Sequence, residues 1–120
     1  MLETFAESVI IEYGHIDYLI NNALPLMHGV DECSYKEFQY AMSVGVTAPF
    51  YLAKLFMPYF NDGSSIINIS PSSDRMSQPQ TESYTAAKGG IVALIHALAV
   101  SLAGKVRVNS RKLICNDFCQ

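Results

Sequence analysis

The sequence predicts an α/β fold in which a three-stranded parallel sheet carries its helices on one face. Two observations support this prediction. Segments with helical periodicity alternate with short apolar runs along the 120 residues, in the order α-β-α-β-α-β, which is typical of a parallel sheet. The runs IDYLINNA and SSIINIS place hydrophobic side chains on both faces, as buried parallel strands do. At this length we expect residues 1–120 to form a single domain.

The first helix and the first strand occupy the N-terminal part of the chain. Apolar residues recur at helical spacing from Leu2 to Tyr13, and Gly14 is a typical helix stop. The run IDYLINNA, residues 16–23, predicts the first strand, and LPLMHGVDEC after it predicts a loop.

The first of two long helices follows this loop. Ser34 and Glu37 have the spacing of a capping box, so we expect a helix from Ser34 to about Phe60, with a kink at Pro49. The residues NDGS, 61–64, predict a turn, and SSIINIS after them predicts the second strand.

The second long helix is expected from Glu82 to about Ala103, after the polar loop PSSDRMSQPQTE. It is apolar nearly all round after Lys88, which predicts burial on more than one side. His96 lies on this helix and is therefore expected to be a histidine with satisfied hydrogen bonds or an interface histidine, not a catalyst. Gly104 ends the helical pattern, and KVRVNSRKLI predicts the third strand.

This element order leaves one face of the sheet bare. Right-handed crossovers between adjacent strands, taken in sequence, place every connecting helix on the same face. Strands that are apolar on both sides should not leave their other face in water, so we expect a second copy or another partner to cover it. Charged residues make up 16% of the chain, against about 25% in a typical domain. This shortage of charge also indicates a covered surface.

Composition argues against several classes of function. The net charge of −3 provides no basic stripe for nucleic acid. Cys33, Cys115 and Cys119 suggest free thiols in a reducing cytosol, and neither the cysteines nor the histidines have metal-ligand spacing. MLETFAES has no apolar signal core, and the longest nearly apolar run, Gly89 to Val100, is too short to span a bilayer. We therefore expect a cytoplasmic protein without nucleic-acid or membrane partners.

Four segments together resemble a known family in their order and spacing: GHIDYLINNA, VTAPFYLAK, SSIINIS and SYTAAKGGIVALIHALAVSLAGKVRVNS. The chain resembles the short-chain dehydrogenase/reductase family over about residues 3 to 110. The resemblance implies the central part of a Rossmann-like domain and an oxidoreductase that uses NAD or NADP. It would also require a glycine-rich turn that binds the cofactor's pyrophosphate at a helix N-terminus. These 120 residues contain no such glycine cluster.

Tyr84 and Lys88 match the family's Tyr-x-x-x-Lys motif. They lie four residues apart on a predicted helix, hence on one face, and no other tyrosine in the chain has a lysine at this spacing. The resemblance implies that Tyr84 is the general acid/base of hydride transfer and that Lys88 also holds the nicotinamide ribose. A phenol ionises near pH 10, and a nearby ammonium lowers that pKa.

Two other catalytic positions of the family are substituted. Pro71 stands where the family has the serine that polarises the substrate carbonyl, and proline has neither a hydroxyl nor a backbone N–H to donate. Gly45 stands where the family has an asparagine that kinks the long helix and holds a relay water. The resemblance therefore implies an incomplete site.

The end of the first strand resembles the family's Asn-Asn-Ala-Gly motif beside the cofactor. Here the sequence is NNAL, with Leu24 in place of a glycine that would let the backbone approach a ligand closely. The resemblance implies Asn22, Ala23 and Lys88 as cofactor contacts. The other role of the asparagines is to cap and brace the sheet, and the sequence favours that role.

Three functions remain open at this point. The first is a degenerate, truncated member of the family without oxidoreductase activity of its own, which associates with itself. The resemblance implies packing through the helices 34–60 and 82–103, and the bare sheet face would add a second contact. The second is a working NAD(P)-dependent oxidoreductase that acts through Tyr84 and Lys88. The third is a binding module for an unrelated ligand.

Overall fold

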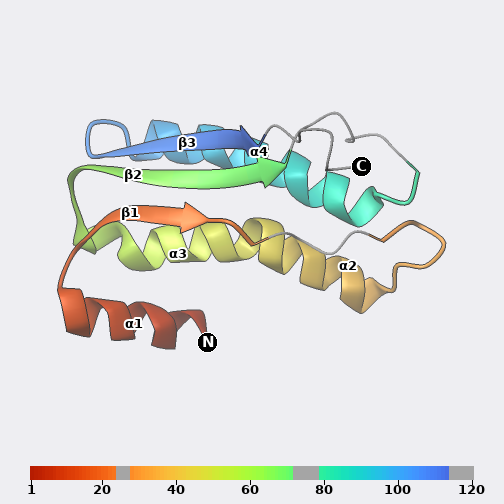
Figure 1. The fold of residues 1–120 in the computed structure, drawn as a ribbon, viewed down its shortest axis with the longest axis horizontal. Helices are drawn as coiled ribbons and strands as arrows, with labels where there is room; N and C mark the ends of the chain where they lie inside the picture. Colours follow the sequence, from red (N-terminus) through yellow and green to blue (C-terminus); the bar gives the residue numbers. More distant parts are fainter. Residues whose placement is uncertain (24–27, 72–78, 114–120) are drawn as a thin grey trace.

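Three parallel strands in the order β1-β2-β3 form one sheet in the computed structural model, as the sequence predicts (Figure 1). The strands are β1 (Ile16–Asn21), β2 (Phe60–Pro71) and β3 (Val106–Leu113). The structure describes residues 1–23, 28–71 and 79–113. The predicted α-β-α-β-α-β order is confirmed, with the second helical segment divided into shorter elements.

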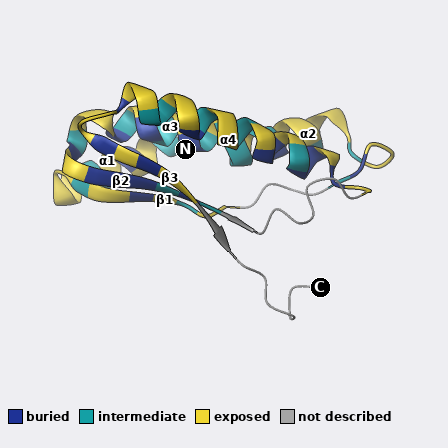
Figure 2. Cartoon of the chain, turned by 90° about the horizontal axis from the view of Figure 1, so that it is seen from above, coloured by how far each residue is buried: buried dark blue, intermediate teal, exposed yellow. Residues whose placement is uncertain are grey.

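The helices lie on one side of the sheet, again as predicted (Figure 2). Their bounds are α1 (Leu2–Tyr13), α2 (Tyr35–Met42), the π-helical η1 (Ser43–Thr47), α3 (Ala48–Phe56), the 3-10 turn η2 (Met57–Tyr59) and α4 (Glu82–Ser101). The predicted capping box at the start of α2 is confirmed. The Glu37 N–H donates to Ser34 Oγ at 3.1 Å, and the Ser34 N–H donates to Glu37 Oε2 at 3.4 Å.

The long helical segment is irregular just before Pro49, not at it. A proline at position 49 has no N–H to donate to the carbonyl of residue 45, so a regular helix would leave that carbonyl without its partner. The chain instead widens into the π turn η1, in which the Ala48 N–H donates to the Ser43 carbonyl. Pro49 then lies in the first turn of α3, where its missing N–H is tolerated.

The predicted turn at residues 61–64 is wrong, because these residues belong to β2. Ile16 pairs with Phe60 and Tyr18 with Ser65, so an advance of two residues along β1 corresponds to five residues along β2. The excess is taken up by a bulge in which Gly63 has a φ of 80°. The turn-forming residues NDGS thus produce an irregular strand segment instead of a chain reversal.

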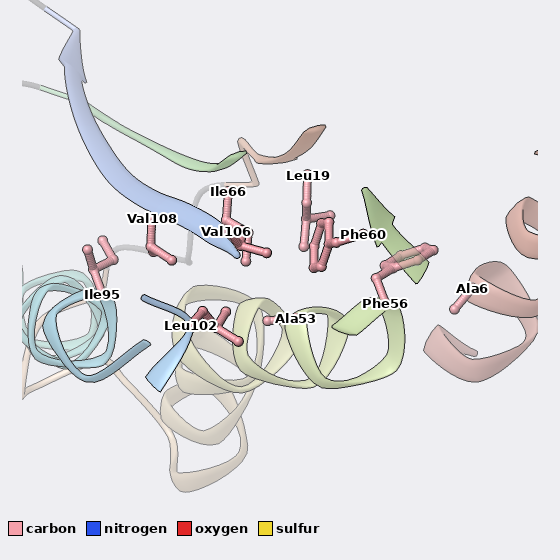
Figure 3. Packing of buried hydrophobic residues seen from close by; sticks show 10 residues of the cluster. All are labelled: Ala6, Leu19, Ala53, Phe56, Phe60, Ile66, Ile95, Leu102, Val106 and Val108. Atoms are coloured by element: carbon pink, nitrogen blue, oxygen red, sulfur yellow. The ribbon is translucent and has the colours of Figure 1, made fainter. Parts of the chain in front are cut away.

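The core fills the space between the sheet and the helices (Figure 3). Leu19, Ile66 and Val108 form a row of paired residues across the three strands, and all three side chains are buried. Phe56 faces them from α3 and meets Phe5 of α1 edge to face, with ring centroids 6.4 Å apart. The ten buried members of this core are Ala6, Leu19, Ala53, Phe56, Phe60, Ile66, Ile95, Leu102, Val106 and Val108.

The opposite face of the sheet is bare among the described residues. Side chains alternate along a strand, so Tyr18, Ile20, Arg107 and Asn109 point away from the helices. Tyr18 is 66% exposed and Ile20 is 57% exposed. The expectation of strands apolar on both faces therefore fits β1, whereas β3 presents polar, exposed residues on its outer face.

The expectation that α4 is buried on more than one side is wrong for the single chain. Only 28% of its most apolar 18-residue window is buried, and Val100 is 80% exposed. His96 is exposed as well, on the side of the helix that was expected to be buried. By length and composition α4 could cross a membrane, although core helices of water-soluble proteins meet the same criterion. Its exposed side is an apolar surface that none of the described residues covers.

Candidate active site

The candidate site lies where α4 begins, beyond the carboxyl ends of the strands (Figure 1). In parallel α/β sheets this edge is where ligands bind. Tyr84 and Lys88 occupy the first two turns of α4. Both side chains are buried, with Tyr84 5% exposed and Lys88 6% exposed.

Lys88 lies directly over the tyrosine ring. Its Nζ is 5.7 Å from the centroid of the Tyr84 ring, a separation at which a cation is attracted to an aromatic face. Burying an ammonium is costly unless other groups compensate its charge. An ammonium in this place would favour the phenolate form of the tyrosine, which is what an acid/base tyrosine requires.

The asparagines at the end of β1 have different surroundings. Asn21 Nδ2 donates to Asn68 Oδ1 at 2.9 Å, and the two residues are paired across β1 and β2. Asn68 is buried, so this bond joins the two strands near their carboxyl ends. Asn22 and Ala23 are exposed. The expected role of the asparagines in bracing the sheet thus fits Asn21, which joins β1 to β2. No pattern in the sequence indicated Asn68 as its partner.

Gly45 lies in η1, which packs against α4. At the contact, a Cβ added to Gly90 would lie 3.0 Å from Val46 Cγ2, so the two elements approach closely just beyond Lys88. Gly45 therefore lies in a π turn that packs beside α4, the helix that carries Tyr84. Pro71 is the last residue of β2. Leu24 lies outside the described residues.

His28 joins the segment after β1 to the start of α2, a contact that the sequence did not predict. His28 Nδ1 lies 2.6 Å from Glu37 Oε2, and the same carboxylate accepts the capping bond from Ser34. The hydrogen bond from His28, followed by that from the Ser34 backbone, lowers the pKa of Glu37 below its usual value. The capping box identified Glu37 in the sequence as a capping residue, but it gave no indication that His28 would bind to it.

The described part of the chain has a cavity elsewhere. It measures about 240 Å³ and lies between α3 and α4, lined by Phe50, Ala53, Lys54, Met57, Leu98, Ser101 and Leu102. Leu98 is roughly 20 Å along α4 from Tyr84, at ~1.5 Å per residue. This cavity is therefore not part of the Tyr84 site. The described residues contain no group of His, Cys, Asp and Glu that could hold a metal ion.

The pairing of Glu37 with His28 predicts a specific acid sensitivity. Because the folded-state pKa of Glu37 lies below its unfolded value, the ionised carboxylate stabilises the fold above that unfolded value. The stabilisation is lost as the pH falls through the folded-state pKa. We expect Glu37→Gln to reduce the dependence of the melting temperature on pH below about 4.5, relative to the unchanged protein.

Melting followed by circular dichroism between pH 3 and pH 7 would measure this effect. Glu7→Gln on the exposed side of α1 is the matched control, and it should keep the acid dependence of the unchanged protein. Equal acid dependence in the Glu37 and Glu7 variants would contradict the interpretation of the His28–Glu37 pair.

Comparison with known proteins identifies the family of the chain. The family model described as enoyl-(acyl carrier protein) reductase matches residues 1–112. An uncharacterized oxidoreductase of Thermotoga maritima is 37% identical over 76% of the chain, and the L-fucose dehydrogenase of Mus musculus is 32% identical over 90%. The matched regions cover 37% and 41% of those two proteins, so the chain spans less than half of their length.

Solved structures give the same result. The apo SCOR enzyme from Clostridium thermocellum is 41% identical, with a TM-score of 0.83 over 91% of this chain and 46% of its own. A metagenomic short-chain oxidoreductase in complex with NADP is 27% identical, with a TM-score of 0.78 over 96% of this chain and 54% of its own. Matches in sequence and in fold thus extend over nearly the whole chain. The chain belongs to the short-chain dehydrogenase/reductase family.

Proposed function

We propose that these 120 residues keep the acid/base pair of the family but do not transfer hydride by themselves, and that the chain associates with itself. The observation that supports this proposal is the contrast within the site. Tyr84 and Lys88 are buried side by side, while Pro71 and Gly45 occupy the places of the family's serine and asparagine.

The substitution at Pro71 weakens the case for catalysis. Developing negative charge on a substrate oxygen needs a hydrogen-bond donor, and loss of such a donor typically costs about 100- to 1000-fold in rate. Proline offers none. Tyr84 could still exchange a proton with a substrate oxygen, but the carbonyl would be less polarised.

Among the described residues, the chain has candidate contacts for the nicotinamide end of the cofactor but not for its pyrophosphate. A metagenomic relative was solved with NADP, and the family implies NAD or NADP here. Asn22, Ala23 and Lys88 are the residues that could contact the nicotinamide end. A pyrophosphate needs a turn of closely spaced glycines. The described glycines with positive φ are Gly14, Gly63 and Gly104, which lie before the strands or early in them, at the opposite end of the sheet from Tyr84.

Self-association would cover the apolar surfaces that the fold leaves open. One surface lies on α3, η2 and α4, within the predicted helices 34–60 and 82–103, where Phe50 is 46% exposed and Met57 is 45% exposed beside the cavity between α3 and α4. The other is the bare face of the sheet with Tyr18 and Ile20. Covering apolar area stabilises an assembly by about 25 cal/mol per Å².

A second candidate function is an NAD(P)-dependent oxidoreductase that reduces a carbonyl or oxidises an alcohol, with its site completed by another chain. The favouring observation is the burial of Tyr84 and Lys88 in contact with each other. In either case we assign the protein to the cytoplasm, because the free thiol of Cys33 suits a reducing compartment. Neither candidate function involves nucleic acid or a membrane.

Cofactor binding separates the two candidate functions. We expect no saturable change in NADH or NADPH fluorescence up to about 1 mM, the weak end of useful affinity, because the pyrophosphate has no glycine turn to bind. Lys88→Ala is the matched variant. Saturable binding to the unchanged chain that Lys88→Ala abolishes would overturn the proposal and favour the oxidoreductase.

Assembly is tested by light scattering at micromolar concentration. We expect a dimer or larger species, and we expect Phe50→Glu to shift it to monomer, because a carboxylate would be buried in the contact between the long helices. Ile11→Glu is the control, since Ile11 is 84% exposed on α1, away from the proposed contact. A folded monomer of the unchanged chain would contradict self-association.

A further inference from the structure

The first turn of α4 is held by a segment that is distant in sequence. The four N-terminal N–H groups of a helix lack partners within it, and a side chain at the N-cap usually supplies one. Thr81 at the N-cap of α4 makes no side-chain capping bond. The Ser83 N–H, at the second helical position, donates instead to the His28 carbonyl at 3.3 Å.

Ser83 and His28 are joined by two further hydrogen bonds. The His28 N–H donates to Ser83 Oγ at 2.8 Å, and Ser83 Oγ donates to the His28 carbonyl at 3.2 Å. Ser83 is fully buried, so these bonds are shielded from water. A hydrogen bond between buried groups is costly to break, because the polar atoms left behind are not solvated. The main chain of His28 and the start of α4 are therefore fixed to each other.

The residues beside this pair also fit together closely. A Cβ added to Gly29 would lie 1.7 Å from Gln80 Oε1 and 2.8 Å from Gln80 Cα. The second of these atoms belongs to the backbone, so the contact leaves no room for a side chain at position 29. Gln80, in the turn before α4, has a φ of 65°, which few residues other than glycine adopt.

The segment that holds α4 is itself anchored. The Gly29 carbonyl accepts from the Cys33 N–H at 2.8 Å and from the Glu32 N–H at 3.2 Å, which closes a tight turn before α2. The His28 side chain is bound to Glu37 of α2. His28 and Gly29 therefore connect the starts of α2 and α4, with Tyr84 as the residue that follows Ser83.

We propose that His28 and Gly29 act as a remote cap for α4, and that Ser83 is a positioning residue for Tyr84. The three hydrogen bonds and the Gly29–Gln80 contact set the height and rotation of the first helical turn, and thereby the place of the Tyr84 phenol beyond the carboxyl ends of the strands. The inference rests on the proposed role of Tyr84 in the acid/base pair, but its test requires no catalytic activity.

The test is NMR of the full chain with ¹³C-labelled tyrosine, in which the Tyr84 Cζ resonance is assigned by its loss in Tyr84→Phe. We expect Ser83→Ala to move this resonance and to speed amide exchange in the first turn of α4 by roughly tenfold, as for the loss of one or two hydrogen bonds. Ser83→Thr keeps the hydroxyl and should restore the resonance and the exchange rate toward the unchanged values.

Leu102→Ala controls for a general loss of stability, since Leu102 is a core residue at the other end of α4. It should lower stability without moving the Tyr84 resonance. Unchanged resonance and exchange in Ser83→Ala, or an equal shift in Leu102→Ala, would overturn the proposal. Both outcomes are independent of cofactor binding, so they are distinguishable from failure of the proposed function.

A second pair of variants tests the cap without removing Ser83, in case Ser83→Ala does not fold. Gly29→Ala should displace the turn at Gln80 and move the Tyr84 resonance. Gly89→Ala is the matched control, because a Cβ at Gly89 meets nothing within 4 Å although it lies beside Lys88 on α4. Identical spectra for Gly29→Ala and the unchanged chain would contradict the remote cap.

Discussion

Parallel pairing of the three strands is the constraint on which the rest of this structure depends. Parallel neighbours require crossover connections, and right-handed crossovers taken in one direction place the helices on one side. Two consequences follow. The carboxyl ends of the strands meet at one edge, where α4 begins with Tyr84, and the opposite face of the sheet receives no helix from the described chain (Figure 2). The candidate site and the exposed apolar surface thus have the same topological origin.

The same constraint explains how Tyr84 and Lys88 can lie side by side even if the rest of the site is incomplete, as proposed. Tyr84 and Lys88 are placed by the helix to which both belong, and α4 is placed by its packing on β3 and η1. Neither requirement depends on a cofactor or on the serine that, as we propose, Pro71 replaces. A preserved pair is therefore weak evidence for catalysis, and the substituted positions carry more weight in the proposed function.

The fold was predictable to the extent that local patterns determined it. The helix Leu2–Tyr13, the capping box at Ser34 and the parallel order followed from periodicity and capping chemistry. The bulge at residues 61–64 was not predictable, since the same residues favour a turn, and it is pairing with the distant β3, Ser64 with Val106, that draws the segment into the strand. The exposure of His96 was missed because an apolar helix in a sequence does not reveal how many neighbours cover it.

The site was predictable in part for the same reason. The four-residue spacing of Tyr84 and Lys88 is enough to place both side chains on one helix face. The contacts of Ser83 and Asn68 join residues far apart in the chain, and no local pattern indicates them. His28 lacked the spacing of a metal ligand, but its main chain, not its imidazole, makes the contact with α4.

The most direct measurement is a hydride-transfer assay of the concentrated chain with NADH or NADPH and a panel of carbonyl compounds, and with NAD or NADP and alcohols. We expect turnover no higher than that of Tyr84→Phe, since under the proposed function the retained pair has neither a carbonyl-polarising donor nor a pyrophosphate site. Turnover that saturates with substrate and disappears in Tyr84→Phe would contradict it and identify the chain as a working oxidoreductase.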